Sequence, residues 1–399
     1  MSKLDYSGSH LRRLEKTILP TLYLIYPIII DVKEQLISQI RHNIIKTNEG
    51  QFLQAGANQF QSFWTRDFCF ASLGLSSVGE FEVVRNHLQY LLDHLRVEDG
   101  LAARIIESQW SGKTVVLNTV FRFLPYSWRK NSHNKKLKPE YLGEHGTLSI
   151  DSNALIIIAS FQYIRKSNDE KFLEKNRSKL IKAFQFYQNR TNANLITQES
   201  FEDWQDSVKR EGKTFYTNIL YWYAGKLLND AGLLDVDTKR IHQSIQSCFW
   251  SEDFYRSMEL GSQNSLEGNY LAILFDFIPP EEQKALFETC EKHQNNFFPF
   301  CTQPKYPRQD VSWTTKVVGL RHYHDELHWS WILGLKLAAQ RKLALKDQTY
   351  SLLEDLLQRD NTIYEVYSED LKPFETKTYL SEHPFSWGIG IILWALYDI

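Results

Sequence analysis

The sequence predicts an all-α fold, an (α/α)6 barrel in which six helical hairpins form a ring. Apolar residues recur at helical spacing along most of the 399 residues, whereas the alternation typical of strands is scarce. Every second predicted helix is also preceded by a cluster of polar and aromatic residues. This alternation fits hairpins with one inner and one outer helix, because the inner N-termini then meet on one face. A helical solenoid would show a repeat of fixed length, and the sequence has none.

Apolar periodicity predicts twelve helices. The odd-numbered ones begin with ordinary charged residues, such as NDEK at 168–171, and we expect them on the outside of the ring. The patches LAARII at 101–106 and TVVLNTVF at 114–121 are expected to form short strands in a long connection. The helices are predicted at 31–46, 67–76, 79–95, 150–165, 169–190, 214–230, 236–247, 267–275, 280–291, 325–342, 347–359 and 385–397.

The even-numbered helices are expected on the inside of the ring, with their N-termini around one cleft. Helix N-termini present unpaired backbone N–H donors and partial positive charge, which suits hydroxyl-rich ligands and carboxylates. The clusters that lead into them are, in order, FWTRD, HGTLSIDSN, DWQDSVKREGKTFY, NSLEGNY, HYHDELHW and SEHPFSW.

The chain is predicted to be one catalytic domain over 1–399, with 1–27 as an N-terminal lead-in segment. No linker or low-complexity tract divides it. The apolar run at 17–30 contains two prolines and is too short to span a bilayer. A polar start without an apolar signal core predicts a cytoplasmic protein with no membrane partner, although export by a signal-independent route is left open. We expect a monomer.

Charge and cysteine content exclude several classes of function. The formal charge is −2, from 46 basic and 48 acidic residues, so nucleic acid is not expected as a partner. The four cysteines show no metal-ligand spacing, and neither a metal nor a cofactor is predicted. Aromatic residues are plentiful, at 14% of the chain. An aromatic excess can reflect a large core, but it also suits carbohydrate, whose apolar ring faces stack on flat side chains.

Three acidic residues stand in the clusters or ahead of an inner helix: Asp67, Asp206 and Glu365. Glycoside hydrolysis needs two carboxyl groups on opposite sides of the scissile bond. Each carboxylate alone is more simply a helix cap or a surface charge. Asp67 in particular would serve as an N-cap, with Arg66 as its ion-pair partner and Trp64 in the core. Their joint placement ahead of inner helices favours catalysis.

Four segments resemble those of six-hairpin glycosidases, in the same order along positions 58–399. WTRDFCFASLGL resembles the WTRD segment of glucoamylases and amylo-1,6-glucosidases, and more loosely the VRDF segment of neutral invertases. DWQDSVKREGKTFYTNILYW is similar to the DWxDS…G…YTN pattern of glycogen-debranching-like proteins. RHYHDELHWSWILGL resembles their YHxGxVWPW helix start, and the final segment from EVYSED to GIILWAL resembles their terminal ExY…FSW element.

The resemblance implies an inverting exo-glycosidase that releases glucose from α-glucans such as glycogen, starch or maltooligosaccharides. It makes Asp206 the general acid and Glu365 the general base, with carboxyl groups roughly 6.5–9.5 Å apart. We expect Asp206 to be the more sheltered of the two and to keep its proton near neutral pH, and Glu365 to be ionised and hydrogen-bonded to water. Trp64, Arg66, Asp67, Trp204, His324 and Trp329 are implied to bind the terminal sugar.

The sequence departs from the family pattern at two points. Relatives usually carry a glutamate where this chain has Gln205-Asp206, so Asp203 is an alternative acid. Glu326 replaces a small residue and adds a carboxylate near the site. Asp151 is most simply an N-cap, and Arg210 part of a solvated loop face. Alternative functions are an invertase- or trehalase-like disaccharide hydrolase and a non-catalytic carbohydrate-binding toroid.

Overall fold

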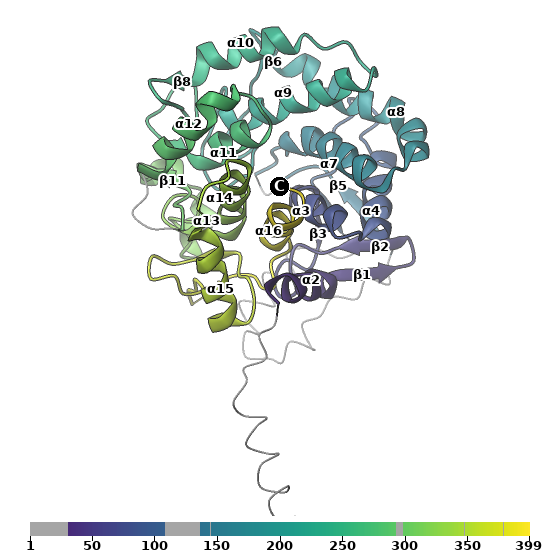
Figure 1. The fold of residues 1–399 in the computed structure, drawn as a ribbon. Helices are drawn as coiled ribbons and strands as arrows, with labels where there is room; N and C mark the ends of the chain where they lie inside the picture. Colours follow the sequence, from purple (N-terminus) through teal and green to yellow (C-terminus); the bar gives the residue numbers. More distant parts are fainter. Residues whose placement is uncertain (1–30, 108–135, 144, 293–297, 347, 378) are drawn as a thin grey trace, which may run out of the picture.

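The protein is described by a computed structural model that covers residues 31–107, 136–143, 145–292, 298–346, 348–377 and 379–399. Its helices form two concentric layers around one axis (Figure 1). The predicted (α/α)6 barrel is confirmed. The expected lead-in at 1–27 and the expected strand at 114–121 lie outside the described residues.

Six inner helices form the closed ring. Each contacts the next along the chain, and the last contacts the first. They are buried on nearly all sides, because outer helices cover one side and the other inner helices cover the rest. This burial explains why their sequences are apolar almost throughout. The inner helices are α3 (Thr65–Ser77), α7 (Asp151–Ser167), α9 (Phe215–Asp230), α11 (Leu266–Leu274), α14 (Ser330–Lys342) and α16 (Ser386–Tyr397).

Six outer helices cover the ring and bury one face each. In α10, for example, Ile241, Ile245 and Phe249 point inward at helical spacing, and the rest of the helix is polar. Side-chain caps start several of them, as where Asp169 accepts the Phe172 amide. The outer helices are α2 (Val32–His42), α4 (Phe81–Asp93), α8 (Glu170–Gln185), α10 (Thr238–Phe249), α12 (Pro280–Lys292) and α15 (Gln348–Asp360).

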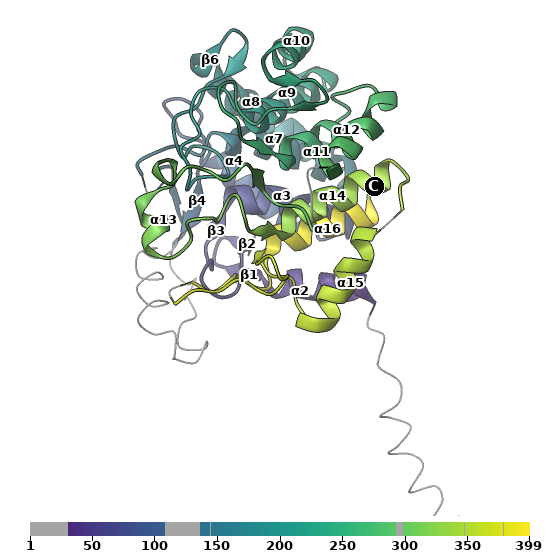
Figure 2. The same cartoon turned by 90° about the vertical axis from the view of Figure 1, so that its left-hand side faces the viewer.

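Short antiparallel strands link the helices, mostly on the side where the inner helices begin (Figure 2). The three that matter for the site are β3 (Phe63–Trp64), β4 (Ile105–Glu107) and β5 (Lys138–Glu140), which form one sheet. β12 (His328–Trp329) pairs with β13 (Val366–Tyr367). The remaining pairs are β1 (Ile44–Thr47) with β2 (Gly50–Leu53), β6 (Thr191–Asn192) with β7 (Leu195–Ile196), β8 (Trp250–Ser251) with β9 (Phe254–Tyr255), and β10 (Asn264–Ser265) with β11 (Thr302–Gln303). Short helical turns occupy Phe186–Arg190, Arg308–Asp310 and α13 (Trp313–Val317).

All twelve predicted helices are present, and three have bounds that differ by more than two residues. The first ends at His42 rather than at residue 46, because the following residues form the β1–β2 hairpin. The fifth ends at Gln185 rather than at residue 190, because Phe186–Arg190 form a 3-10 turn. The tenth begins at Ser330 rather than at residue 325, because His328 and Trp329 pair with β13. The strand expected at 101–106 is partly confirmed as β4.

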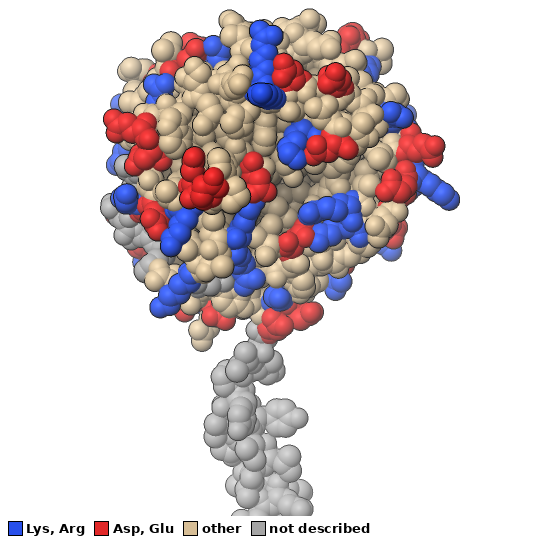
Figure 3. All heavy atoms as spheres, turned by 45° about the horizontal axis from the view of Figure 1, so that its top comes forward, with Lys and Arg blue, Asp and Glu red and all other residues tan. Residues whose placement is uncertain are grey.

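The surface carries mixed charge. On the face shown in Figure 3, acidic and basic side chains alternate and no broad field of one sign appears among the described residues. In the same part of the chain, none of the helices has the length and apolar character needed to span a bilayer.

Candidate active site

A pocket of about 210 Å³ opens where the inner helices begin. It is built from the start of α3, the loop ahead of α9, the segments ahead of α14 and β13, and the start of α16. All eight residues proposed from the sequence line it: Trp64, Arg66, Asp67, Trp204, Asp206, His324, Trp329 and Glu365. The structure adds Phe60, Arg104, Tyr323, Phe385 and Trp387 to the lining.

The WTRD segment turns from strand to helix at the pocket. Trp64 pairs with Ile105 in β4 and is the N-cap of α3, without a side-chain capping bond. Asp67 is the third residue of the helix, so the reading of Asp67 as an N-cap is wrong. Arg66 does not need Asp67 as a partner, because its guanidinium is held by another carboxylate.

That carboxylate belongs to Asp151 at the start of α7. Its two oxygens accept Arg66 Nε at 2.6 Å and Arg66 Nη2 at 3.1 Å, and the Tyr216 hydroxyl donates to it at 3.2 Å. Asp151 is fully buried and is the first helical residue, so the N-cap interpretation is also wrong here. It is a support for the site, since it fixes the guanidinium that faces the pocket.

Asp206 lies between two arginines. Its Oδ2 is 3.6 Å from Arg66 Nη1 and 3.7 Å from Arg104 Nη2, and its side chain is 35% exposed. The Arg104 guanidinium also lies over the Trp64 ring, 4.5 Å from the centroid. Both guanidinium groups lie within ion-pair distance of its carboxyl group.

Glu365 lies deep in the pocket, and both of its oxygens accept phenolic hydroxyls. Tyr379 donates to Oε2 at 2.6 Å and Tyr323 donates to Oε1. Burial raises the pKa of Glu365 to about 8, although the two phenols act in the opposite direction. Two expectations are therefore wrong: that Asp206 is the more sheltered carboxylate, and that Glu365 is ionised near neutral pH. Glu365 is 3% exposed, because the tyrosines and the helix starts enclose it.

Because the pKa of Glu365 is raised, we expect Glu365→Gln to stabilise the fold by an amount that depends on pH. Between the ordinary value of 4.5 and about 8, the folded protein holds a proton that the unfolded chain releases. Wild-type stability therefore falls as the pH rises through this window. The wild-type protein loses about 1.4 kcal/mol of its free energy of unfolding for each unit by which the pKa is raised. The variant does not titrate here and keeps this stability. Melting temperatures at pH 5 and pH 8 should show a stabilisation by the variant that grows with pH. An equal difference at both pH values would contradict the raised pKa.

Asp67 lines the same pocket as Asp206 and Glu365. Burial raises its pKa to about 7, and Arg66 opposes the rise. Asp206 acts on the pKa of Asp67, and Asp67 acts on that of Glu365, so the three carboxyl groups share one electrostatic environment. An acidic cluster of this kind in an aromatic pocket is typical of a catalytic site.

Indole and imidazole rings form the floor of the pocket. Trp204 meets Trp329 nearly edge-on, with centroids 5.5 Å apart, and the His324 ring is stacked on Trp329 at 5.3 Å. His324 Nδ1 is 2.7 Å from the Ser207 hydroxyl. Burial lowers the pKa of His324 well below its ordinary value, so the ring is neutral. These contacts hold the side chains that line the pocket in place.

Trp204 is held by a buried cluster of charged residues outside the pocket lining. The Trp204 indole donates to Glu267 Oε1 at 2.9 Å, and Arg210 lies 3.4 Å from Asp203 and 3.6 Å from Glu267. Arg210 is fully buried, so its placement on a solvated loop face is wrong. Asp203 is buried against Arg210 and does not line the pocket, which disfavours it as the acid.

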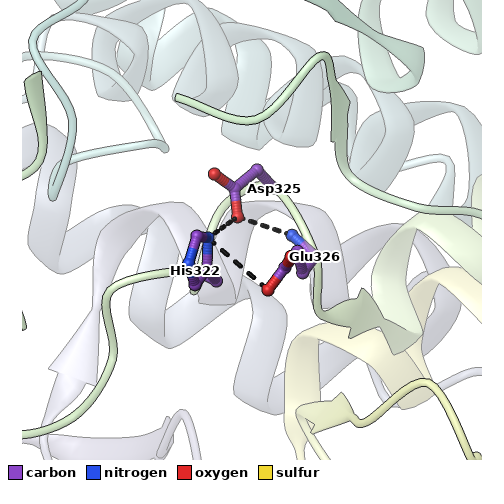
Figure 4. Close-up of side chains that lie close together, drawn as sticks. All are labelled: His322, Asp325 and Glu326. Atoms are coloured by element: carbon purple, nitrogen blue, oxygen red, sulfur yellow. Dashed lines mark hydrogen bonds and ion pairs between the residues drawn. The ribbon is translucent and has the colours of Figure 1, made fainter. Parts of the chain in front are cut away.

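The carboxylate of Glu326 lies outside the pocket lining. It forms a group with His322 and Asp325 whose ligand-type atoms lie within 4.8 Å of one another (Figure 4). Asp325 accepts the Tyr306 and Glu326 amides and contacts His322, and Glu326 pairs with Lys305. These bonds give the trio a structural role at the turn ahead of α14.

Comparisons with known proteins relate the chain by fold alone. No family model and no curated protein matches the sequence. A rhamnosidase from Klebsiella oxytoca with rhamnose bound is similar, with 11% identity and a TM-score of 0.63 over 92% of this chain; the match spans 63% of the rhamnosidase. A GH63 mannosylglycerate hydrolase from Thermus thermophilus in complex with Tris shows 13% identity and a TM-score of 0.62, over 91% of this chain and 99% of its own. A glycosidase variant in complex with glucose shows 12% identity and a TM-score of 0.62, over 98% of this chain and 98% of its own.

This chain has the fold of the six-hairpin glycosidases. The structures above are described as a rhamnosidase, a mannosylglycerate hydrolase and a glycosidase. The finer resemblance to glucoamylases and amylo-1,6-glucosidases stays a prediction.

Proposed function

We propose that this protein is an inverting, exo-acting glycoside hydrolase that releases glucose from the non-reducing ends of α-glucans. The observation that carries the proposal is the pair Asp206 and Glu365, which face one small aromatic pocket in a fold shared with glycosidases. The two groups come from loops about 160 residues apart in sequence and meet at the same pocket.

The pocket geometry supports Asp206 as general acid and Glu365 as general base. In an exo-acting pocket the terminal sugar enters first, so the leaving group points toward the opening. Asp206 is the half-exposed carboxyl and is suited to protonate the glycosidic oxygen there. Glu365 is enclosed, and in its ionised form, which prevails above about pH 8, it is suited to take a proton from the water that attacks the opposite face of the sugar. Its phenolic partners hold the carboxylate in one orientation.

The rest of the lining is suited to a single sugar ring. A volume of about 210 Å³ is small for a ligand pocket. Trp64 and Trp204 supply flat apolar faces, and Asp67 with the Nη1 side of Arg66 supplies charged hydrogen-bond partners for hydroxyls. The choice of glucose and of α-glucans rests on the sequence resemblance to glucoamylases.

A disaccharide-type hydrolase is the second candidate. The small pocket suits a short substrate, and one protein with this fold is described as a mannosylglycerate hydrolase. Invertase- and trehalase-like activities belong to this class.

A substrate panel tests the proposal. Purified protein is incubated with glycogen, maltoheptaose, sucrose and trehalose, and released glucose is measured against an Asp206→Asn preparation as the blank. We expect glucose from maltoheptaose and glycogen. Release only from sucrose or trehalose would favour the disaccharide hydrolase. Release from none of the four would contradict the proposal and favour a binding module.

Asp67→Asn should weaken turnover while leaving the fold intact. A charge-assisted hydrogen bond to a sugar hydroxyl contributes about 1.5–3 kcal/mol, so kcat/KM should fall by roughly 10- to 150-fold. Because the pKa of Asp67 is about 7, wild-type sugar binding should strengthen as the pH rises through 7, and the variant should lose this dependence. The test is to measure kcat/KM of both proteins at pH 6 and pH 8, with the melting temperature as a control for folding. Full activity with lost thermal stability would make Asp67 a structural residue.

A further inference from the structure

A buried carboxylate behind the pocket, Glu382, has no part in the proposed chemistry. It precedes α16 and is fully buried. Oε1 accepts the Asn58 amide at 2.7 Å and the His383 amide at 3.0 Å. Oε2 accepts the Gln59 amide at 2.6 Å and the Phe60 amide at 2.7 Å. All four bonds come from backbone amides, so this one side chain fixes a whole turn of backbone.

The turn that Glu382 holds carries part of the pocket wall. The rings of Phe60 and Trp64 meet nearly edge-on with centroids 6.2 Å apart, and both line the pocket. Two further bonds join the same segments. Asn58 Nδ2 donates to the His383 carbonyl at 2.6 Å, and Gln59 Nε2 donates to the Leu380 carbonyl at 2.7 Å.

The main chain of Glu382 reaches the other side of the site. Its carbonyl accepts the Glu365 amide at 2.8 Å, and the Glu365 carbonyl in turn accepts the Ser330 amide at the start of α14. We propose that Glu382 is a positioning residue that sets the Phe60–Trp64 wall at a fixed place relative to Glu365. The positioning role is argued from these contacts alone, whereas its expected effect on kinetics rests on the proposed glycosidase function.

Gly56 shows how closely the carboxylate is enclosed. A Cβ at this position would lie 2.1 Å from Glu382 Cγ and 2.3 Å from Cδ. Gly56→Ala therefore displaces the carboxylate without changing its charge. Glu382→Gln makes the complementary change, because it keeps the shape and leaves one acceptor oxygen for four amides. Both should loosen the same turn.

Hydrogen exchange tests the positioning without any substrate. Exchange of peptides covering 56–64 is followed by mass spectrometry in the full chain. Glu382→Gln and Gly56→Ala should each raise exchange in these peptides by about tenfold or more and leave distant inner helices unchanged. The matched control is Asp169→Asn, which alters the carboxylate that caps α8 and contacts Arg85, and it should leave 56–64 unchanged. Unchanged exchange at 56–64 in a folded variant, or an equal rise over the whole chain, overturns the proposal.

Kinetics give the second readout. On maltoheptaose, both variants should raise KM by about tenfold with less than a threefold change in kcat, because the wall binds the sugar and does not take part in proton transfer. If Glu382→Gln does not fold, Gly56→Ala decides both readouts. Faster exchange at 56–64 in a protein that hydrolyses none of the panel would support the positioning role and contradict the proposed function. An unchanged KM in variants with faster exchange would contradict the placement of the wall in sugar binding.

Discussion

Asp206→Asn is expected to abolish hydrolysis of α-glucans but to spare part of the activity on α-glucosyl fluoride, whereas Glu365→Gln removes both. Fluoride leaves without a proton, so the general acid is dispensable for that substrate, and water activation is required for every substrate. Losing a general acid or base typically costs about 10²–10⁴-fold in rate. Steady-state rates of glucose release by both variants on maltoheptaose and on the fluoride measure the effect.

The pH dependence of the Asp206→Asn variant separates the two possible assignments. With the acid removed, fluoride hydrolysis should rise as the pH increases through about 8, because Glu365 must be ionised to act as the base. Exchanged roles would give the opposite pattern, in which Asp206→Asn is inactive on both substrates and Glu365→Gln retains the fluoride activity.

Arg66→Met is expected to have the largest effect on stability. It removes the bidentate partner of Asp151, whose carboxylate is fully buried, and leaves that charge with only hydroxyl donors. Breaking one partner of a buried ion pair costs about 3–5 kcal/mol. Urea unfolding should show this loss in the free energy of unfolding. Activity per folded molecule should also fall, because the pocket loses the guanidinium group proposed to bind sugar hydroxyls.

Two further variants control for this result. Adding Asp151→Asn to Arg66→Met removes the uncompensated charge and should restore part of the stability in a double-mutant cycle. Lys226→Met breaks an exposed pair with Asp230 at 2.7 Å and should cost less than about 1 kcal/mol. A loss for Arg66→Met no larger than that for Lys226→Met would show that Asp151 needs no cation.

The helices were predictable because their signal is local. The period of apolar residues located the helices, and the polar and aromatic clusters ahead of every second helix indicated which are inner. Both layers are as expected. Errors occurred where strand pairing decides the structure. His328 and Trp329 look helical in sequence but pair with β13, and the residues after His42 fold back on β2.

The gathering of the proposed residues around one pocket was predictable, but the electrostatics of the pocket were not. All eight proposed residues line one pocket, because the clusters mark the starts of inner helices. Which carboxylate is sheltered depends on Tyr323 and Tyr379, whose approach to Glu365 no local pattern reveals. The partnership of Arg66 with Asp151, 85 residues away, is equally invisible in sequence.

The anomeric form of the first-formed product tests inverting exo-hydrolysis most directly. Proton NMR follows maltoheptaose hydrolysis at times shorter than mutarotation. Attack by a water held by Glu365, on the face opposite the leaving group, predicts that β-glucose appears first. This outcome also requires the two carboxyl groups to lie roughly 6.5–9.5 Å apart. Initial release of α-glucose would show a covalent intermediate and would contradict the roles assigned to Asp206 and Glu365.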